Sequence, residues 1–448
     1  MGNDVCGDLC IRRVAYSYVG SDSLIHISGT MMNRPIGFVQ LLLVASFVCL
    51  FSVATTQAQQ PKKETLIRTL KTGIESSKQR ALDQLVTLGD DPMVLEVLLT
   101  VLKKDSRTSS NDSKLRMLQM VGKHSDNAEV VSVLESHLEA RNHKLVMVAV
   151  DSLAKVGSIA SLSKIEALVK HPSYDDVYGF RKCIIQAVLQ LRDKRSIVFA
   201  VKQLEGLSGQ LEFDIARYLH HISLQPFADN AEKWKTWFRD NYPDFNFEEN
   251  SEPYSLSGKP PEDFKWPKDT AEFFGIYIYA KRLLFVVDTS SSMTSNVGGQ
   301  TRLALAKREL VKAIKGLPSD VHFGIVAYNT KVTTWGRELK EANINNREAA
   351  VKWVEKLAMG KGTASYDALD RAMDVDGNTE AIFFLSDGAP SKGRITDKNE
   401  IVATLTKKNF FRRIAFYTIG IGIGGGETEA MMRQLAEKNS GAYEPVNQ

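Results

Sequence analysis

Three oxygen-bearing side chains follow a short apolar run at residues 283–287. Asp288, Ser290 and Ser292 form the pattern Asp-x-Ser-x-Ser. One carboxylate and two hydroxyls are hard oxygen donors, which suit Mg²⁺, Mn²⁺ or Ca²⁺ rather than Zn²⁺. The same residues also fit an ordinary polar turn in which Asp288 or a serine caps the next helix. The pattern therefore predicts either a divalent-metal site or a strand-to-helix turn.

Two further loops carry residues of the same chemistry. Thr363 lies in the glycine-rich segment 360–365, and Asp387 follows the apolar segment 382–385. Parallel strands present their carboxyl ends at one edge of a sheet, so both residues are expected beside Asp288. Thr363 could instead cap the helix that follows it, and Asp387 with the glycine after it could be only a turn.

The segments around these residues alternate between strand and helix patterns. Apolar runs predict buried strands, and amphipathic spacing predicts helices between them. Such alternation gives an α/β fold, a doubly wound and mainly parallel sheet with helices on both faces. Strands are expected at 273–279, 281–287, 321–328 (with an edge partner at 332–335), 380–385, 413–421 and 442–446, and helices at 302–317, 347–357, 365–373, 400–408 and 428–438.

Residues 59–241 have a different, repetitive pattern. Equivalent apolar positions recur at spacings of 33, 35, 35 and 31 residues, at Leu88, Val121, Val156, Leu191 and Ile222. A period of this length with two helices per unit predicts an all-α solenoid, and the stretch resembles HEAT-like repeats. Such a solenoid could offer a concave protein-binding surface or serve as a rigid arm.

Residues 242–270 are rich in proline, serine and charged side chains, which is typical of a linker. Phe264 and Trp266 are expected to anchor this linker to a neighbouring element. The C-terminal domain is then expected to span residues 271–448.

A basic start, an apolar run at 36–54 and small residues up to Ala58 make residues 31–58 resemble a signal peptide. We expect translation to begin at Met31 or Met32, which makes residues 1–30 an upstream extension. The protein is then exported, to the periplasm or cell envelope. The alternative is an uncleaved anchor, because about 19 apolar residues can just span a bilayer; only then would the protein contact the membrane.

The formal net charge of the chain is only +4. Neither half carries the basic excess of a nucleic-acid-binding protein, so no nucleic-acid partner is expected. The four cysteines have no zinc-site spacing; they are Cys6, Cys10, Cys49 and Cys183. Cleavage after Ala58 would leave Cys183 alone, without a disulfide and in a helix core.

Residues 281–448 resemble a von Willebrand factor A-type domain with a metal-ion-dependent adhesion site. The family pattern is Asp-x-Ser-x-Ser after the first strand, a threonine in a glycine-rich loop and an aspartate after a later strand. All five positions are filled here, by Asp288, Ser290, Ser292, Thr363 and Asp387. The resemblance implies a Mg²⁺ site, with Mn²⁺ or Ca²⁺ as alternatives. It also implies that a carboxylate of a protein partner completes the coordination.

The order of repeats, linker and A-type domain resembles a group of exported bacterial proteins with HEAT-like repeats. Two features depart from the family pattern. Ser291 stands where glycine is common, and the chain ends at Gln448, just after the last predicted strand. The helix whose sliding transmits affinity changes in some family members is therefore not expected.

We predict a non-enzymatic, metal-dependent protein-binding module on a helical-repeat scaffold. The sequence has no Gly-x-Ser-x-Gly elbow, His-Glu-x-x-His pattern or P-loop. One alternative is a hydrolase or other enzyme that uses the cluster of Asp288 and Ser292. The other is a pure scaffold that binds its partner through the repeats.

Overall fold

The structure, a computed structural model, describes residues 62–103, 112–124, 127–247, 255–264, 266 and 270–447. From Lys63 on, the described residues belong to one compact unit, Lys63–Gln448. The predicted extension and signal segment, residues 1–58, lie outside the described residues. Across the described ranges, every helix is too short or too polar to cross a lipid bilayer.

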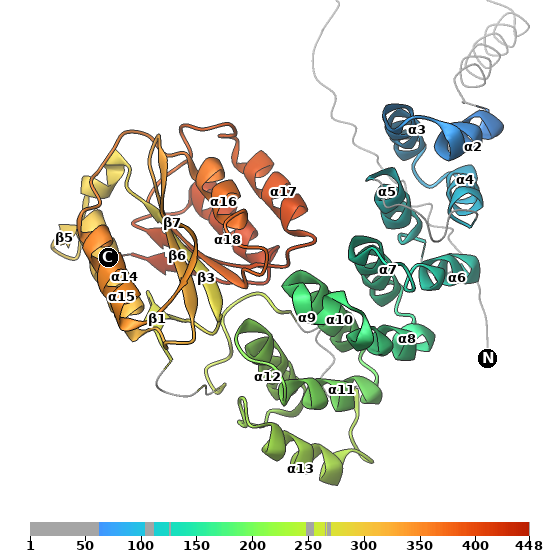
Figure 1. The fold of residues 1–448 in the computed structure, drawn as a ribbon, viewed down its shortest axis with the longest axis horizontal. Helices are drawn as coiled ribbons and strands as arrows, with labels where there is room; N and C mark the ends of the chain where they lie inside the picture. The colour runs from blue at the N-terminus through green and yellow to red at the C-terminus, as the bar shows by residue number, and fades with distance from the viewer. Residues whose placement is uncertain are drawn as a thin grey trace, which may run out of the picture. The chain divides into compact units, whose positions relative to one another are not determined.

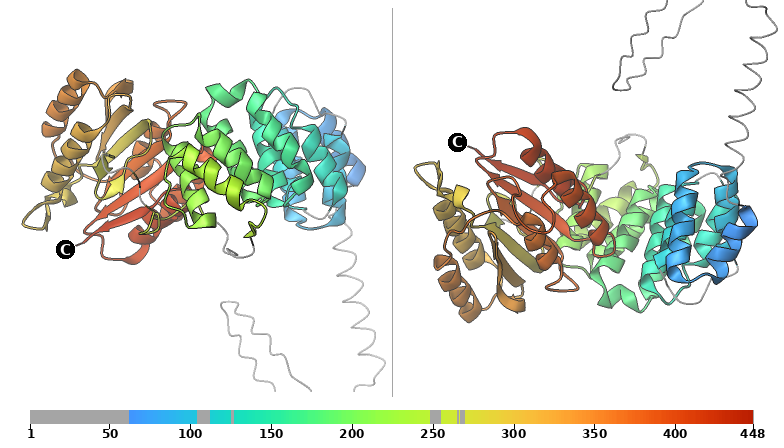
Figure 2. Two further views of the ribbon diagram at one scale, coloured as in Figure 1. Left: turned by 90° about the horizontal axis from the view of Figure 1, so that it is seen from below. Right: turned by 90° about the horizontal axis from the view of Figure 1, so that it is seen from above.

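The first described part of the chain is a run of short helices that stack on one another, as Figure 2 shows. Several begin at an Asp or Asn whose side chain accepts a hydrogen bond from the second helical N–H, which fixes where the helix starts. The helices are α2 (Lys63–Thr72), α3 (Glu75–Thr87), α4 (Pro92–Leu102), α5 (Asp112–Val121), α6 (Ala128–Ser136), α7 (His143–Lys155), α8 (Leu162–Glu166), α9 (Ser173–Asp176), α10 (Tyr178–Gln190), α11 (Lys194–Leu204), α12 (Gln210–Ser223) and α13 (Ala231–Asn241).

Neighbouring helices cover one another's apolar faces, as the repeat pattern predicts. Helix α5 packs on α7, and α7 packs on α10. One continuous core results, and the helical character predicted for this region is confirmed. Cys183 lies in this core as a free thiol, as expected, and burial raises its pKa to about 12.

A six-stranded sheet follows, in the order β10-β9-β8-β3-β6-β7 (Figure 1). All neighbouring pairs are parallel except β6 and β7, so the predicted mainly parallel sheet is confirmed. The strands are β3 (Arg282–Asp288), β6 (His322–Tyr328), β7 (Val332–Glu341), β8 (Ala381–Ser386), β9 (Ala415–Ile421) and β10 (Tyr443–Val446), with the short hairpins β1 (Glu272–Phe273) with β2 (Ile276–Tyr277) and β4 (Asn296–Val297) with β5 (Gln300–Thr301).

Helices cover both faces of this sheet. Successive residues of β3 point to opposite faces: Phe285 joins one core and Val286 the other. Helices α14 (Arg302–Gly316) and α15 (Ile344–Glu355) pack on the first face. The second face is covered by α16 (Ser365–Met373), α17 (Lys398–Asn409) and α18 (Gly426–Glu437), as Figure 1 shows.

Two strands differ from the sequence prediction. The expected strand 273–279 is the hairpin of β1 and β2, because Phe274 and Gly275 adopt positive φ angles of 51° and 75° and turn the chain. Strand β7 runs on to Glu341 rather than ending at 335, with a register shift against β6 between Phe323 and Ile325. An irregularity of this kind hides the alternation on which the prediction relied.

The repeat helices contact the edge at which the parallel strands begin. Glu380, just before β8, accepts hydrogen bonds from the backbone N–H groups of Gln210 and Lys281, both at 3.0 Å. Arg413, just before β9, donates to the Asp151 carboxylate at 2.7 Å. These contacts join the repeats to the sheet through the buried Glu380 and the partly buried pair of Arg413 and Asp151.

The described part of the segment between the repeats and the sheet also lies against the repeats. Phe264 and Trp266 both make edge-to-face contacts with Phe213 of α12, so the expected anchoring is confirmed. The Arg217 guanidinium donates to backbone carbonyls from Leu256 to Lys259.

Candidate metal centre

Asp288 is the last residue of β3, in the middle of the sheet and between two parallel neighbours. Its side chain is fully buried. One carboxylate oxygen accepts the Ser290 N–H at 2.8 Å, which folds the loop back over the strand end. The other accepts the Ser386 hydroxyl at 2.8 Å and the Tyr328 hydroxyl at 3.3 Å. Asp288 therefore joins the ends of three adjacent strands.

Burial raises the pKa of Asp288 to about 6. The hydrogen bonds from Ser290 and Ser386 oppose this rise, and the nearby Asp387 carboxylate adds to it. A cation at this place would favour the ionised form of Asp288.

The predicted serines and Asp387 form a short chain of oxygens. The hydroxyls of Ser290 and Ser292 lie 2.9 Å apart, and the Ser292 hydroxyl donates to Asp387 at 2.7 Å. Neighbouring ligands of an octahedral Mg²⁺, each about 2.05 Å from the ion, lie about 2.9 Å apart. The spacing and chemistry of these oxygens therefore fit a hard divalent cation.

Arg302, the first residue of α14, also contacts this cluster. Its guanidinium donates to the second oxygen of Asp387 at 3.0 Å and to the Gly422 carbonyl at 3.3 Å. The Asp387 side chain has no exposed surface, so this ion pair is largely shielded from water. Sequence reasoning missed Arg302, Ser386 and Tyr328. Only Ser386 carried a signal, because it directly precedes Asp387 at the end of a strand.

Thr363 lies in the loop that approaches from α15. The Gly360 N–H donates to the Thr289 carbonyl at 2.8 Å, which ties this loop to the one after β3. Thr363 is buried, and its N–H donates to the Ser391 hydroxyl. The alternative that Thr363 caps α16 is wrong, since Ala364 occupies the cap position without a side-chain hydrogen bond. Among the described residues, the Thr363 hydroxyl makes no direct hydrogen bond to any of the other four predicted residues.

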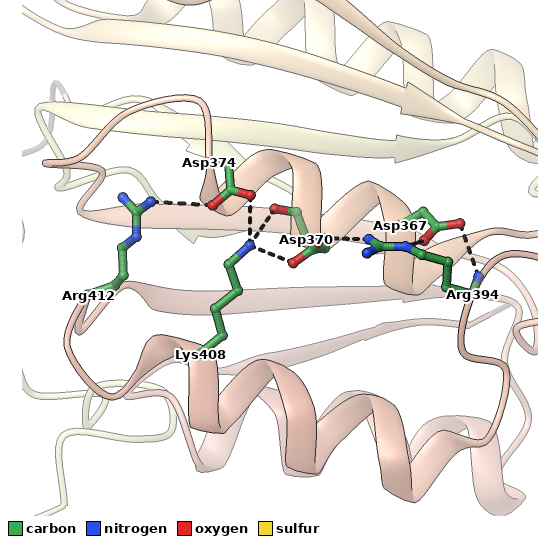
Figure 3. A network of polar contacts seen from close by, with 6 residues as sticks. All are labelled: Asp367, Asp370, Asp374, Arg394, Lys408 and Arg412. Atoms are coloured by element: carbon green, nitrogen blue, oxygen red, sulfur yellow. Dashed lines mark hydrogen bonds and ion pairs between the residues drawn. The ribbon is translucent and has the colours of Figure 1, made fainter. Parts of the chain in front are cut away.

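A network of ion pairs fixes helix α16, which begins directly after this loop (Figure 3). Two aspartates of α16 and Asp374, which directly follows it, point toward basic side chains from the segment after Asp387, from the end of α17 and from the turn after α17. The network therefore links the loop of Thr363 to the loop of Asp387. Its members are Asp367, Asp370, Asp374, Arg394, Lys408 and Arg412.

Other kinds of metal site find no support in the part of the chain that the structure describes. There, no three His, Cys, Asp or Glu side chains come together as ligands. Four of the five predicted residues, Asp288, Ser290, Ser292 and Asp387, instead form one hydrogen-bonded cluster that mixes hydroxyls with carboxylates.

Comparison with known proteins identifies relatives of the domain that carries this site. The von Willebrand factor type A domain matches residues 281–445. Human von Willebrand factor A domain-containing protein 3B is 26% identical over 184 residues, covering 41% of this chain and 13% of that protein. Human inter-alpha-trypsin inhibitor heavy chain H2 is 26% identical over 181 residues, covering 37% of this chain and 18% of that protein. The chain thus spans less than a fifth of these two relatives.

Two solved structures are similar to part of this chain. A von Willebrand factor type A protein from Catenulispora acidiphila has a TM-score of 0.33 and 21% identity, covering 37% of this chain and 38% of that one. An aerotolerance-related membrane protein from Bacteroides fragilis has a TM-score of 0.30 and 18% identity, covering 37% and 91%. The family match and the mainly parallel sheet show that residues 281–445 are a von Willebrand factor type A domain.

Proposed function

We propose that this protein is a metal-dependent protein-binding module. A divalent cation, Mg²⁺ or alternatively Mn²⁺ or Ca²⁺, would lie at the edge of the sheet where the parallel strands end. An acidic group of a protein partner would bind to that cation. The observation that carries the proposal is the chain of contacts from the Ser290 hydroxyl through Ser292 to Asp387.

Each residue has a distinct role in this proposal. The hydroxyls of Ser290, Ser292 and Thr363 would hold the cation. Asp387 would orient the Ser292 hydroxyl and supply charge. Asp288 would hold the strand ends in place, since its two oxygens already accept hydrogen bonds from Ser290, Ser386 and Tyr328.

Charge explains why such a site would select an acidic partner. Hydroxyl ligands carry no formal charge, and Arg302 already neutralises part of Asp387. A bound divalent cation would therefore keep a positive charge that the partner's carboxylate can neutralise.

The hydrolase alternative would need a base to activate Ser292. Among the described residues, the base that its hydroxyl contacts is Asp387, whose other oxygen is held by Arg302. Histidine is the usual base of such an arrangement, and His322 lies at the opposite end of the sheet, at the start of β6. This geometry favours binding over catalysis.

The helical repeats would act as a scaffold that presents the A-type domain, residues 271–448. Their contacts with Glu380 and Arg413 support this role, because these contacts leave the opposite edge of the sheet to a partner. We also propose that residues 31–58 export the protein to the periplasm or cell envelope, or anchor it in a membrane if they are not cleaved.

Calorimetric titration of Mg²⁺ and Mn²⁺ into the full chain tests this proposal. The wild-type protein should take up one ion, and Asp387→Ala and Ser292→Ala should each lose this uptake. Asp397→Ala is a matched control, because Asp397 caps α17 outside the cluster and should not matter for metal uptake. The absence of wild-type uptake, even with acetate present as a carboxylate mimic, would reject the metal site.

A further inference from the structure

Three exposed lysines surround the loop of Thr363. We propose that these edge lysines, Lys331, Lys361 and Lys392, form a second part of the partner-binding surface. They would select an acidic protein segment with several carboxylates over one with a single carboxylate. This inference rests on the proposed function, because the metal edge would take the first of these carboxylates.

Backbone contacts hold the three lysines close together. The N–H of Thr330, next to Lys331, donates to the Lys361 carbonyl at 2.9 Å. A Cβ atom added at Gly362 would lie 2.6 Å from the Lys392 Cγ atom. The Lys392 N–H in turn donates to the Thr363 carbonyl at 3.3 Å. Three separate loops therefore bring their lysines to one place beside a predicted ligand.

These lysines differ from the basic residues nearby. Arg394 and Lys408 are paired with the aspartates of α16, as Figure 3 shows. Within the described ranges, no carboxylate lies within ion-pair distance of an edge lysine. Like charges held together without counter-charges oppose folding, so their gathering indicates a ligand that supplies the missing charges.

The loops at this edge are strongly unbalanced in charge. They contain the three edge lysines, Arg394, which pairs with Asp367 and Asp370, and a single acidic residue, Asp387, which Arg302 already pairs. The loops are residues 289–301, 329–331, 358–364, 387–396 and 422–426. By contrast, the whole chain has a net charge of only +4 among 448 residues. The positive charge is therefore local to this edge.

An acidic protein segment fits this edge better than another polyanion. The hydroxyl-lined site offers a place for one carboxylate, and the lysines lie around it as separate point charges. Met359, in the same loop as Lys361, is 50% exposed and could contact apolar side chains of a polypeptide. Nucleic acids share the charge but bring no carboxylate, and anionic lipids bring no polypeptide side chains to Met359.

Two labelled synthetic peptides test the proposal by fluorescence anisotropy. Both are glycine-serine peptides of equal length, one with a single aspartate and the other with four. With Mg²⁺, the full chain should bind the four-aspartate peptide about tenfold more tightly at low salt, since each exposed pair contributes a little. This preference should shrink as salt is added. The triple variant Lys331→Gln, Lys361→Gln, Lys392→Gln should lose it.

A matched triple variant controls for the loss of three charges. Lys123→Gln, Lys170→Gln, Lys202→Gln changes three exposed lysines of the helical repeats and should keep the preference. Survival of the preference in the edge-lysine variant would overturn the inference. The inference would also fail if the edge-lysine variant lost binding to vesicles with 30% phosphatidylserine but bound both peptides as the wild type does. That result would point to a membrane as the ligand of these lysines.

Chelation separates this inference from the proposed function. If EDTA abolishes binding of the single-aspartate peptide, the metal-dependent function holds whatever the lysine variants do. If EDTA changes neither peptide's affinity but the edge-lysine variant still loses the preference, the lysine surface holds and the metal-dependent function fails.

Discussion

At the edge where the parallel strands begin, charged groups are buried or partly buried against the helical repeats. Glu380 accepts two backbone N–H groups, and Arg413 pairs with Asp151. The loops at the opposite edge carry hydroxyls and the Asp387–Arg302 pair. They also carry three lysines that have no carboxylate partner among the described residues. We call the first the closed edge, because the chain's own residues complete it, and the second the open edge. Under the proposed function, the open edge is completed by the cation and the partner.

The largest effect is expected at the closed edge, from Lys182→Met. Lys182 and Asp214 form an ion pair at 3.1 Å with side chains that are 0% and 4% exposed. Removing the cation leaves buried negative charge, which should lower the free energy of unfolding by about 3–5 kcal/mol in a urea titration. Lys164→Met breaks the exposed pair with Glu135 and should cost less than about 1 kcal/mol. Similar losses of unfolding free energy in both variants would show that the buried pair contributes no more than the exposed one, against this account.

A second effect at the closed edge depends on pH. Burial raises the pKa of Glu380 to about 7 from an ordinary 4.5, so between these values the folded state holds a proton that the unfolded state has lost. The contribution of Glu380 to stability therefore falls as pH rises from about 4.5 to about 7. Glu380→Gln should be more stable than wild type at pH 8 by on the order of 3 kcal/mol, and equal to it near pH 4. Urea titrations at the two pH values would measure this, and a difference independent of pH would contradict it.

At the open edge, Arg302→Met removes the positive charge beside Asp387. The site then attracts a cation more strongly, and the Mg²⁺ dissociation constant from calorimetry should fall by about tenfold. Arg308→Met is the matched control, because Arg308 lies on the same helix and pairs with the neighbouring Glu309. Weaker Mg²⁺ binding in Arg302→Met would mean that the arginine mainly positions Asp387.

The smallest effect is expected from Thr363→Ala. Its hydroxyl would be one ligand among several, so Mg²⁺ affinity should fall only a few-fold, less than about 1.4 kcal/mol. Thr294→Ala removes a hydroxyl that bonds within its own turn, to the Ser291 carbonyl, and should leave calorimetric Mg²⁺ affinity unchanged. Equal affinities of wild type and Thr363→Ala would exclude this threonine as a ligand.

Much of the open edge could be predicted from the sequence, and little of the closed edge. Asp288 and Asp387 each follow a continuous apolar strand, so the parallel topology alone places them at one edge. The sequence places Thr363 in a loop but does not predict its distance from the serines. That distance depends on the path of the loop, which contacts such as Gly360 with Thr289 determine.

Arg302 and Glu380 show what a single sequence hides. Arg302 begins an ordinary amphipathic helix, and only its tertiary neighbours reveal the pair with Asp387. Glu380 meets Gln210 across 170 residues, a contact that no local pattern contains. Helix and strand patterns report local burial, whereas such pairs depend on how distant elements meet.

The position of Mn²⁺ in crystals of the full chain would test the central claim most directly. Mn²⁺ scatters anomalously and can replace Mg²⁺ at oxygen ligands. We predict one anomalous peak within ligand distance of the Ser290 and Ser292 hydroxyls, and none at the edge occupied by Glu380. Crystals that contain Mn²⁺ but show no peak at the serines, or a peak only elsewhere, would contradict the account.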